Sequence, residues 1–241
     1  MRGVILAGGT GTRLRPLTTY INKHLLPVGR YPMIYYAVEK LRLAGITDVL
    51  LVTGQQSAGL YTHFLGSGRE WGVSMTYRIQ EEAGGIAQAL ACAEDFADRA
   101  EPLVVLLGDN LFEDPLSPYI ESFRKQSGGA KVLLKKVEDP RRYGVPILEA
   151  GRIARILEKP SDPPSPYCVT GIYMYHADVF EIIRQIHPSA RGEMEITDVN
   201  NVYASQERLT YDVLPGWWID AGTFPSLDEA ARRLSQAETP S

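Results

Sequence analysis

A glycine-rich stretch near the start of the chain has the residue types of a phosphate site. It reads ILAGGTGTRLRPLT over Ile5–Thr18, so a short apolar run enters Gly8, Gly9 and Gly11 and is followed by Arg13. Glycines leave successive backbone N–H groups uncovered, and these can close on a phosphate. A strand that leads into such a loop forms an anion site. We therefore expect this loop to bind phosphate groups rather than only to reverse the chain.

Two common phosphate-binding motifs do not fit this loop. The dinucleotide fingerprint needs a third glycine where this chain has Leu14. The P-loop needs a lysine and a hydroxyl residue after its last glycine, where this chain has Thr12 and Arg13. The loop is expected to bind phosphates as a member of neither class.

Two aspartates follow apolar runs that read as strands. Asp109 comes directly after LVVLLG, and Asp220 comes directly after PGWWI. Ligands of open parallel sheets bind beyond the carboxyl ends of the strands. Either residue alone could be a helix N-cap or a turn residue. Two carboxylates that face one phosphate loop instead predict Mg²⁺, which is commonly held by one or two carboxylates and substrate phosphates.

Two lysines are further candidates for phosphate contacts. Lys23 precedes an apolar run that fixes its backbone near the core, and Lys159 lies between Glu158 and Pro160. The alternative for Lys159 is an ordinary surface ion pair with its neighbour. Both lysines are therefore candidate site residues.

The elements that position these residues can be read from hydrophobic periodicity. In the first half, strands are predicted at 3–6, 48–52, 73–79 and 102–107, and helices at 33–44, 57–65 and from Gly84 and Gly85 to Phe96. In the second half, strands are predicted at 130–137, 152–157, 167–175 and 209–219, and helices at 179–186, 195–203 and 226–237. Thr197 or a neighbour is expected to cap the second of these helices, with Glu193 and Glu195 forming a capping box. The order predicts a doubly wound, mostly parallel sheet in a single domain over 1–241.

Composition excludes several classes of protein. The chain has 241 residues, 44% of them hydrophobic, and a net charge of −4 without a basic stripe, so we expect no nucleic-acid partner. Its two cysteines lie in apolar contexts, and its four histidines lack metal-ligand spacing. No apolar run is long enough for a membrane span, and the first residues enter a strand rather than a signal peptide. These features predict a cytoplasmic protein.

A series of motifs along nearly the whole chain resembles one family. The stretches ILAGGTGTRLRPLT, NKHLLPVGRYPMIYY, GGIAQAL, VLLGDNLF, RYGV, LEKP, VTGIYMY and RGEMEITDVN are similar, in this order, to sugar-phosphate nucleotidylyltransferases. Within the family the resemblance is strongest to short bacterial enzymes that thymidylylate glucose 1-phosphate. It implies a Rossmann-like mixed sheet, Mg²⁺ as cofactor, dTTP and glucose 1-phosphate as substrates, and a homo-oligomer. The products would be dTDP-glucose and pyrophosphate.

The resemblance also implies roles for individual residues. Those matching the nucleotide site are Leu6, Gly8, Gly9, Gly11, Thr12, Arg13, Lys23, Gln80 and Gly85, of which Gln80 and Gly85 match positions that read the thymine. Those matching the sugar-phosphate site are Asn110, Gly144, Glu158, Lys159 and Val169. Asp109 and Asp220 match the metal ligands, and with Arg13, Lys23 and Lys159 they make up the implied catalytic set. Residues 1–110 would mainly bind nucleotide, and residues 111–241 mainly sugar phosphate.

Three alternatives remain open from the sequence. The first is UTP, or another sugar 1-phosphate, on the same scaffold. The second is a nucleotide-sugar sensor without turnover, against which the complete set of Arg13, Lys23, Asp109 and Asp220 argues. The third is a dehydrogenase, which the failed fingerprint and the missing acidic residue about 20 positions later disfavour.

Overall fold

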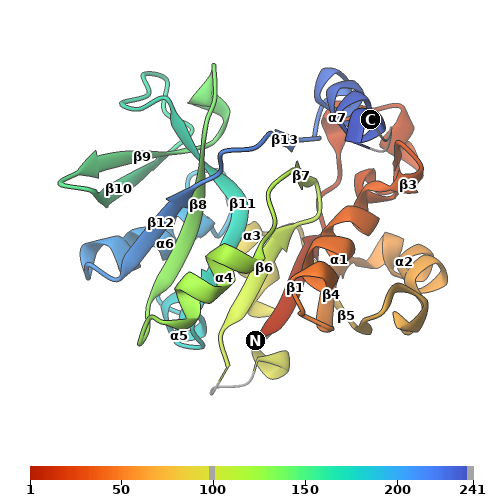
Figure 1. Ribbon diagram of the computed structural model, residues 1–241, viewed down its shortest axis with the longest axis horizontal. Helices are drawn as coiled ribbons and strands as arrows, with labels where there is room; N and C mark the ends of the chain where they lie inside the picture. Colours follow the sequence, from red (N-terminus) through yellow and green to blue (C-terminus); the bar gives the residue numbers. More distant parts are fainter. Residues whose placement is uncertain (98–100, 238–241) are drawn as a thin grey trace.

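Seven strands form a central mixed sheet within residues 1–97 and 101–237, the part of the chain that the computed structural model describes (Figure 1). In spatial order they are β12 (Leu209–Val213), β8 (Ala130–Lys136), β11 (Tyr167–Tyr175), β6 (Leu103–Leu107), β1 (Arg2–Ala7), β4 (Asp48–Gly54) and β5 (Ser74–Gln80). β1 is parallel to β4 and β6, β4 is parallel to β5, and β12 is parallel to β8. β11 is antiparallel to both of its neighbours. The predicted mostly parallel sheet is confirmed.

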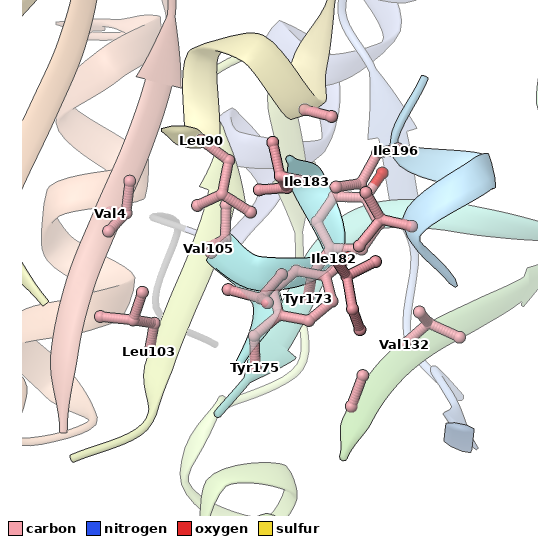
Figure 2. Close-up of a cluster of buried hydrophobic side chains, with 14 of the residues drawn as sticks. Val4, Leu90, Leu103, Val105, Val132, Tyr173, Tyr175, Ile182, Ile183 and Ile196 are labelled. Atoms are coloured by element: carbon pink, nitrogen blue, oxygen red, sulfur yellow. The ribbon is translucent and has the colours of Figure 1, made fainter. Parts of the chain in front are cut away.

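Helices cover both faces of this sheet. On one face α1 (Met33–Leu43), α2 (Ala58–Leu65) and α4 (Ser117–Arg124) pack against residues such as Ile5 and Leu51. On the other face lie α3 (Ile86–Ala91), α5 (Val179–Ile183) and α6 (Ile196–Ser205). These helices pack in a second cluster with Val4 and Leu50, the residues that precede Ile5 and Leu51 in the chain, and Figure 2 shows Val4 in this cluster. Successive strand residues point to opposite faces, so each buried strand supplies both cores.

Three short strand pairs complete the fold. They are the hairpin of β9 (Gly144–Glu149) and β10 (Arg152–Glu158), the pair β7 (Asn110–Phe112) and β13 (Trp218–Asp220), and the pair β2 (Pro27–Val28) and β3 (Tyr31–Pro32). The hairpin extends to one side of the sheet, and α7 (Phe224–Ala237) lies near β3 (Figure 1). Single turns of 3₁₀ helix occur at Thr12–Leu14, Leu17–Thr19, Lys23–Leu25, Gln55–Ser57, Arg69–Trp71, Glu94–Phe96 and Pro140–Arg142. The β7–β13 pair matters most, because it returns the distant Asp220 to the end of β6.

Several predicted elements differ from the observed ones. The helix expected to run to Phe96 ends at Ala91, because acidic side chains at Glu94 and Asp95 are unfavourable at a helix C-terminus and a separate 3₁₀ turn follows. The strand expected over 209–219 divides into β12 and β13, because Pro215 and Gly216 interrupt it. The strands β7 and β9 and the helix α4 were not predicted.

The predicted cap of α6 was also wrong. The helix begins at Ile196 with Glu195 as its N-cap, but no side chain caps it by a hydrogen bond. Thr197 lies inside the helix and donates instead to Glu158 Oε2 at 2.5 Å. The Glu195 carboxylate accepts from Arg191 and from Ser189 rather than from the helix backbone. These groups belong to the site rather than to the helix end.

Two expectations from composition can be compared with the structure. Cys92 is half-buried and Cys168 is buried, and both thiols are free. Among the residues that the structure describes, no helix has both the length and the apolar character needed to cross a bilayer.

Candidate active site

The glycine loop after β1 is held in place by side chains that follow it. Gly11 has φ +64°, a left-handed conformation that glycine adopts without strain. Thr18 Oγ1 donates to the Gly11 carbonyl at 2.7 Å, and Asn22 Nδ2 donates to the Ala7 carbonyl at 3.2 Å. A Cβ built on Gly9 would lie 3.3 Å from Lys23 Cε. The loop backbone therefore lies directly against Lys23.

The residue after Lys23 is a buried, neutral histidine. Burial, and next the charge of Lys23, lower the pKa of His24 to about 3. Its backbone N–H donates to Asn22 Oδ1 at 3.0 Å, and the Tyr61 hydroxyl donates to the same oxygen at 2.9 Å. His24 is 2% exposed and packs inside the fold. This network fixes the short turn that presents Lys23 to the site.

Lys23 and Asp109 form an ion pair at the end of β6. The ammonium donates to Asp109 Oδ2, and both side chains are mostly buried. Burial alone would raise the pKa of Asp109, but the charge of Lys23 holds it well below the usual range. Asn110 Nδ2 donates to Asp109 Oδ1 at 3.1 Å, and the Trp218 indole fixes Asn110 through a 2.7 Å hydrogen bond. The carboxylate of Asp109 is therefore ionised and held in one orientation.

Asp220 reaches the same place from the end of β13. The Ala221 N–H donates to the Asp109 carbonyl at 2.9 Å, which ties the two strand ends together. Burial, and next the charge of Asp109, raise the pKa of the Asp220 carboxyl. Arg13 and Arg142 lie 3.9 and 4.0 Å from Asp220 Oδ2. Two carboxylates whose charges repel each other are a donor set that suits a divalent cation.

A cavity of about 280 Å³ lies between the glycine loop and the start of α3, and we call it the Gln80 cavity. Gln80 is the last residue of β5 and is 7% exposed, and Gly85 precedes α3 with φ +101°. The lining residues are Leu6, Gly8, Gly9, Thr10, Lys23, His24, Gln80, Ala83, Gly85, Ile86, Ala89, Leu107, Asp109 and Glu193. One wall of this cavity is apolar and the other carries Lys23 and Asp109.

A second cavity, of about 480 Å³, lies beside it, and we call it the Glu158 cavity. Glu158 accepts from Thr197 and lies 3.2 Å from Lys159 Nζ and 3.3 Å from an Arg191 nitrogen. Other residues of its lining are Thr12, Arg13, Asp109, Asn110, Arg142, Tyr143, Gly144, Val169, Glu195, Trp218 and Asp220. A carboxylate surrounded by hydroxyl and cationic groups suits a ligand with both hydroxyls and a phosphate.

The two cavities meet, because Asp109, Ile86, Leu107 and Glu193 line both of them. Except for Gly11, every site residue that the sequence singled out lines at least one cavity. Gly11 lies against Lys23, because a Cβ built on Gly11 would lie 2.9 Å from the Lys23 Cβ. The ion pair of Glu158 and Lys159, weighed above as a surface contact, lies in the Glu158 cavity.

Sequence reasoning missed several groups at the site. Arg142 and Tyr143 line the Glu158 cavity, although RYGV was used only for Gly144. Arg191 also lines this cavity, but its stretch RGEMEITD was used only to predict a capping box of Glu193 and Glu195. The motifs contain these residues, but the sequence does not show that the residues lie together in the fold. Gln88, which contacts Gln80, lies in GGIAQAL, but that motif was used only for Gly85.

Comparison with known proteins identifies the family of this chain. Residues 2–237 match the model of the nucleotidyl transferase family. A glucose-1-phosphate thymidylyltransferase of Mycobacterium tuberculosis is 45% identical over 235 residues, which is 96% of this chain and 81% of that protein. One from an Actinoplanes species is 43% identical over 228 residues, which is 93% of this chain and 75% of that protein.

Solved structures extend the likeness to the whole fold. A Bacillus anthracis protein assigned as a glucose-1-phosphate thymidylyltransferase, solved with sucrose, has a TM-score of 0.94 and 54% identity and covers 100% of this chain and 98% of its own. A UDP-glucose pyrophosphorylase bound to UDP-glucose has a TM-score of 0.86 and 29% identity, over 98% of this chain and 99% of its own. The family model spans almost the whole chain, and these relatives are consistent with it. This chain therefore belongs to the nucleotidyl transferase family and is a nucleotidyltransferase.

Proposed function

We propose that this chain transfers the deoxythymidylyl group of dTTP to glucose 1-phosphate, giving dTDP-glucose and pyrophosphate. The observation that carries the proposal is the meeting of the two cavities at Asp109, beside Lys23. A nucleotide in one cavity and a sugar phosphate in the other would have their phosphates next to each other. Holding two reactants in this way removes much of the entropic barrier to their reaction.

The chemistry needs no side-chain nucleophile. An oxygen of the sugar phosphate attacks the α-phosphorus of dTTP, and the bond from that phosphorus to the bridging oxygen breaks, so that pyrophosphate leaves. Because the attacking oxygen is already anionic, the protein must position the two phosphates and neutralise their charge. We assign Arg13 and Lys23 to the nucleotide phosphates, Lys159 to the sugar phosphate, and Glu158 to sugar hydroxyls.

Asp109 and Asp220 are the residues that would hold Mg²⁺. Their oxygen donors and the raised pKa of Asp220 beside Asp109 support this assignment. The ion, when bound, supplies positive charge to the phosphates during transfer.

Most of the remaining residues are assigned by the cavity that they line, and Gly11 and Thr12 are assigned by their place in the glycine loop. We assign Leu6, Gly8, Gly9, Gln80 and Gly85 to the nucleotide, with Thr12 and Gly11 shaping the phosphate loop, and Asn110, Gly144 and Val169 to the sugar phosphate. Residues 1–110 would then mainly bind nucleotide and residues 111–241 mainly sugar phosphate, within one domain. We also propose a homo-oligomer, which sedimentation velocity tests.

A second candidate substrate is UTP. The similar UDP-glucose pyrophosphorylase was solved with a uridine nucleotide, and uracil has the same polar edge as thymine. One methyl group in an apolar pocket is worth about 1–3 kcal/mol. We therefore expect both triphosphates to react, with dTTP preferred by about tenfold.

The test is pyrophosphate release over a matrix of nucleoside triphosphates and sugar 1-phosphates, with products identified by mass spectrometry. The expected result is turnover of dTTP with glucose 1-phosphate, weaker turnover of UTP, and little turnover of ATP or GTP. Binding of dTDP-glucose without any turnover would support the sensor instead. Best activity with a purine triphosphate would refute the thymidylyl assignment.

A further inference from the structure

Gln88 lies on α3 and has no place in the mechanism above, yet its side chain contacts Gln80. The Gly84 backbone N–H donates to Gln88 Oε1 at 2.9 Å. Gln80 Nε2 donates to the same oxygen at 2.8 Å and to the Gly85 carbonyl at 3.3 Å. One hydrogen bond therefore joins the two glutamine side chains to each other, and two join them to the backbone of the loop before α3.

Two backbone groups decide which way both amides face. A backbone N–H only donates, so the Gln88 atom that faces Gly84 must be the oxygen. The amide atom of Gln80 that faces this oxygen and the Gly85 carbonyl must then be the nitrogen. Reversing the Gln80 amide would set oxygen against oxygen at both places, which is costly for a buried side chain.

The other end of the Gln80 amide faces the cavity. A Cβ built on Gly8 would lie 2.5 Å from Gln80 Oε1, so this oxygen lies over the glycine loop. Gly8, Gln80 and Gly85 all line the Gln80 cavity, whereas Gln88 does not. Since the donor end is engaged by Gln88 and Gly85, the cavity receives a hydrogen-bond acceptor.

We propose that Gln88 is a positioning residue for base selection, which locks Gln80 so that only its acceptor oxygen meets the nucleobase. The inference rests on the proposed function, because it concerns a base bound in the Gln80 cavity. Thymine and uracil carry a hydrogen on N3 and can donate to this oxygen. The N3 of cytosine is an acceptor and leaves two acceptors facing each other. Gln88 thus selects between pyrimidines without touching the nucleotide.

The test compares dTTP with dCTP as the nucleotide substrate in Gln88 variants. Gln88→Met keeps the length of the side chain but frees the Gln80 amide to reverse and offer a donor to cytosine. The ratio of kcat/KM for dTTP to that for dCTP should fall at least tenfold, mainly through the KM values, because the base is remote from the reacting phosphorus. Gln88→Ala, a good helix former, carries the same expectation. Thermal melts show that each variant is folded.

The matched control is Gln88→Glu, whose carboxylate still accepts from Gln80 Nε2 and from the Gly84 N–H. It should keep the wild-type ratio within about threefold. In a Gln80→Met background, adding Gln88→Met should change the ratio no further, because Gln88 acts only through Gln80. An unchanged ratio in both Gln88→Met and Gln88→Ala, or an additive loss in the double variant, would overturn the inference.

The inference and the proposed function fail separately. If the wild-type enzyme does not use dTTP or UTP, the proposed function falls whatever the Gln88 variants do. If the wild type prefers dTTP over dCTP and the Gln88 variants keep that preference, only the role of Gln88 is refuted.

Discussion

Asp109 and Asp220 are the residues on which the proposed chemistry depends most. Each carboxylate is fixed by neighbours, Asp109 by Lys23 and Asn110, and Asp220 by the Gly222 N–H at 3.1 Å. Asp109→Asn and Asp220→Asn should each reduce kcat by on the order of 10²–10³, the scale for one preorganised electrostatic contact. Activity of the wild type should require Mg²⁺ and vanish with EDTA. Near-normal kcat in both variants at saturating Mg²⁺ would refute the metal assignment.

Arg13 and Lys159 should affect different kinetic constants. In the proposed function Arg13 neutralises charge beside the leaving pyrophosphate, so Arg13→Ala should lower kcat most. The contact proposed for Lys159 forms as soon as the sugar phosphate binds, so Lys159→Ala should raise KM for glucose 1-phosphate. Lys125→Ala, whose side chain lines neither cavity, is the control. An unchanged sugar KM in Lys159→Ala would contradict the assignment.

His24 should make stability depend on pH. Its pKa is lowered to about 3 in the folded chain, below the ordinary 6.5, so protonation favours unfolding. The stability that the neutral ring contributes is complete above pH 6.5 and is lost as pH falls from there toward 3. Thermal melts at pH 7.5 and pH 5 should show a larger drop in Tm for the wild type than for His24→Gln. Equal drops would mean that the ring is not held neutral by the fold.

At the scale of elements, the glycine before α3 packs closely against the backbone of a distant segment. Gly85 has φ +101°, and a Cβ there would lie 2.5 Å from the Met194 carbonyl oxygen. Gly85→Ala should therefore destabilise the fold by about 1–3 kcal/mol and raise KM for dTTP. Gly59→Ala in α2 is the control, because a Cβ there meets nothing within 4 Å. Denaturant unfolding distinguishes the two, and equal stability in both variants would contradict the expected strain.

The elements that the sequence predicts well are those with a strong internal pattern. The seven strands of the sheet are apolar runs or clear alternations, and α1 has an apolar face that Gly45 terminates. The elements that were missed have weak patterns: β7 has three residues, and β9 contains Pro146, which is tolerated in an isolated two-stranded pair. Pro215 and Gly216 indicate a break between β12 and β13, but a single strand was predicted across them.

Whole-molecule arrangement explains which parts of the site could not be predicted from residues alone. A Rossmann-type strand order places the first and fourth strands side by side, as β1 and β6 are here, so Lys23, Asp109 and the glycine loop could be grouped in advance. Asp220 is brought to the site by the pairing of β13 with β7, and Arg142 is positioned by the 3₁₀ turn before β9. The partnership of Gln80 with Gln88 depends on the angle at which β5 meets α3. No local pattern specifies these long-range placements.

The two cavities are also joined through the backbone. Met194 N–H donates to the Gly84 carbonyl at 2.7 Å, and the Ala87 N–H donates to the Met194 carbonyl at 3.0 Å. A nucleotide that orders the loop before α3 should therefore order the segment that carries Arg191 and Glu195. We expect dTTP, under conditions that prevent turnover, to tighten binding of glucose 1-phosphate by at least about fivefold. Glucose 1-phosphate should tighten binding of dTTP by the same factor. Calorimetric titrations in both orders would reveal independent sites if the affinities did not change.

The same backbone connection constrains how new sugar specificities can be built on this scaffold. A segment around Met194 taken from a relative that uses another sugar would have a different backbone conformation where it contacts Gly84 and Gly85. These two glycines have no room to adjust to it. Recombination within the family should therefore succeed when residues 83–88 and 189–197 are exchanged as one unit, although more than a hundred positions separate them in the chain. Exchanging either segment alone should yield chimaeras with impaired use of both substrates, including the one whose own pocket was left intact.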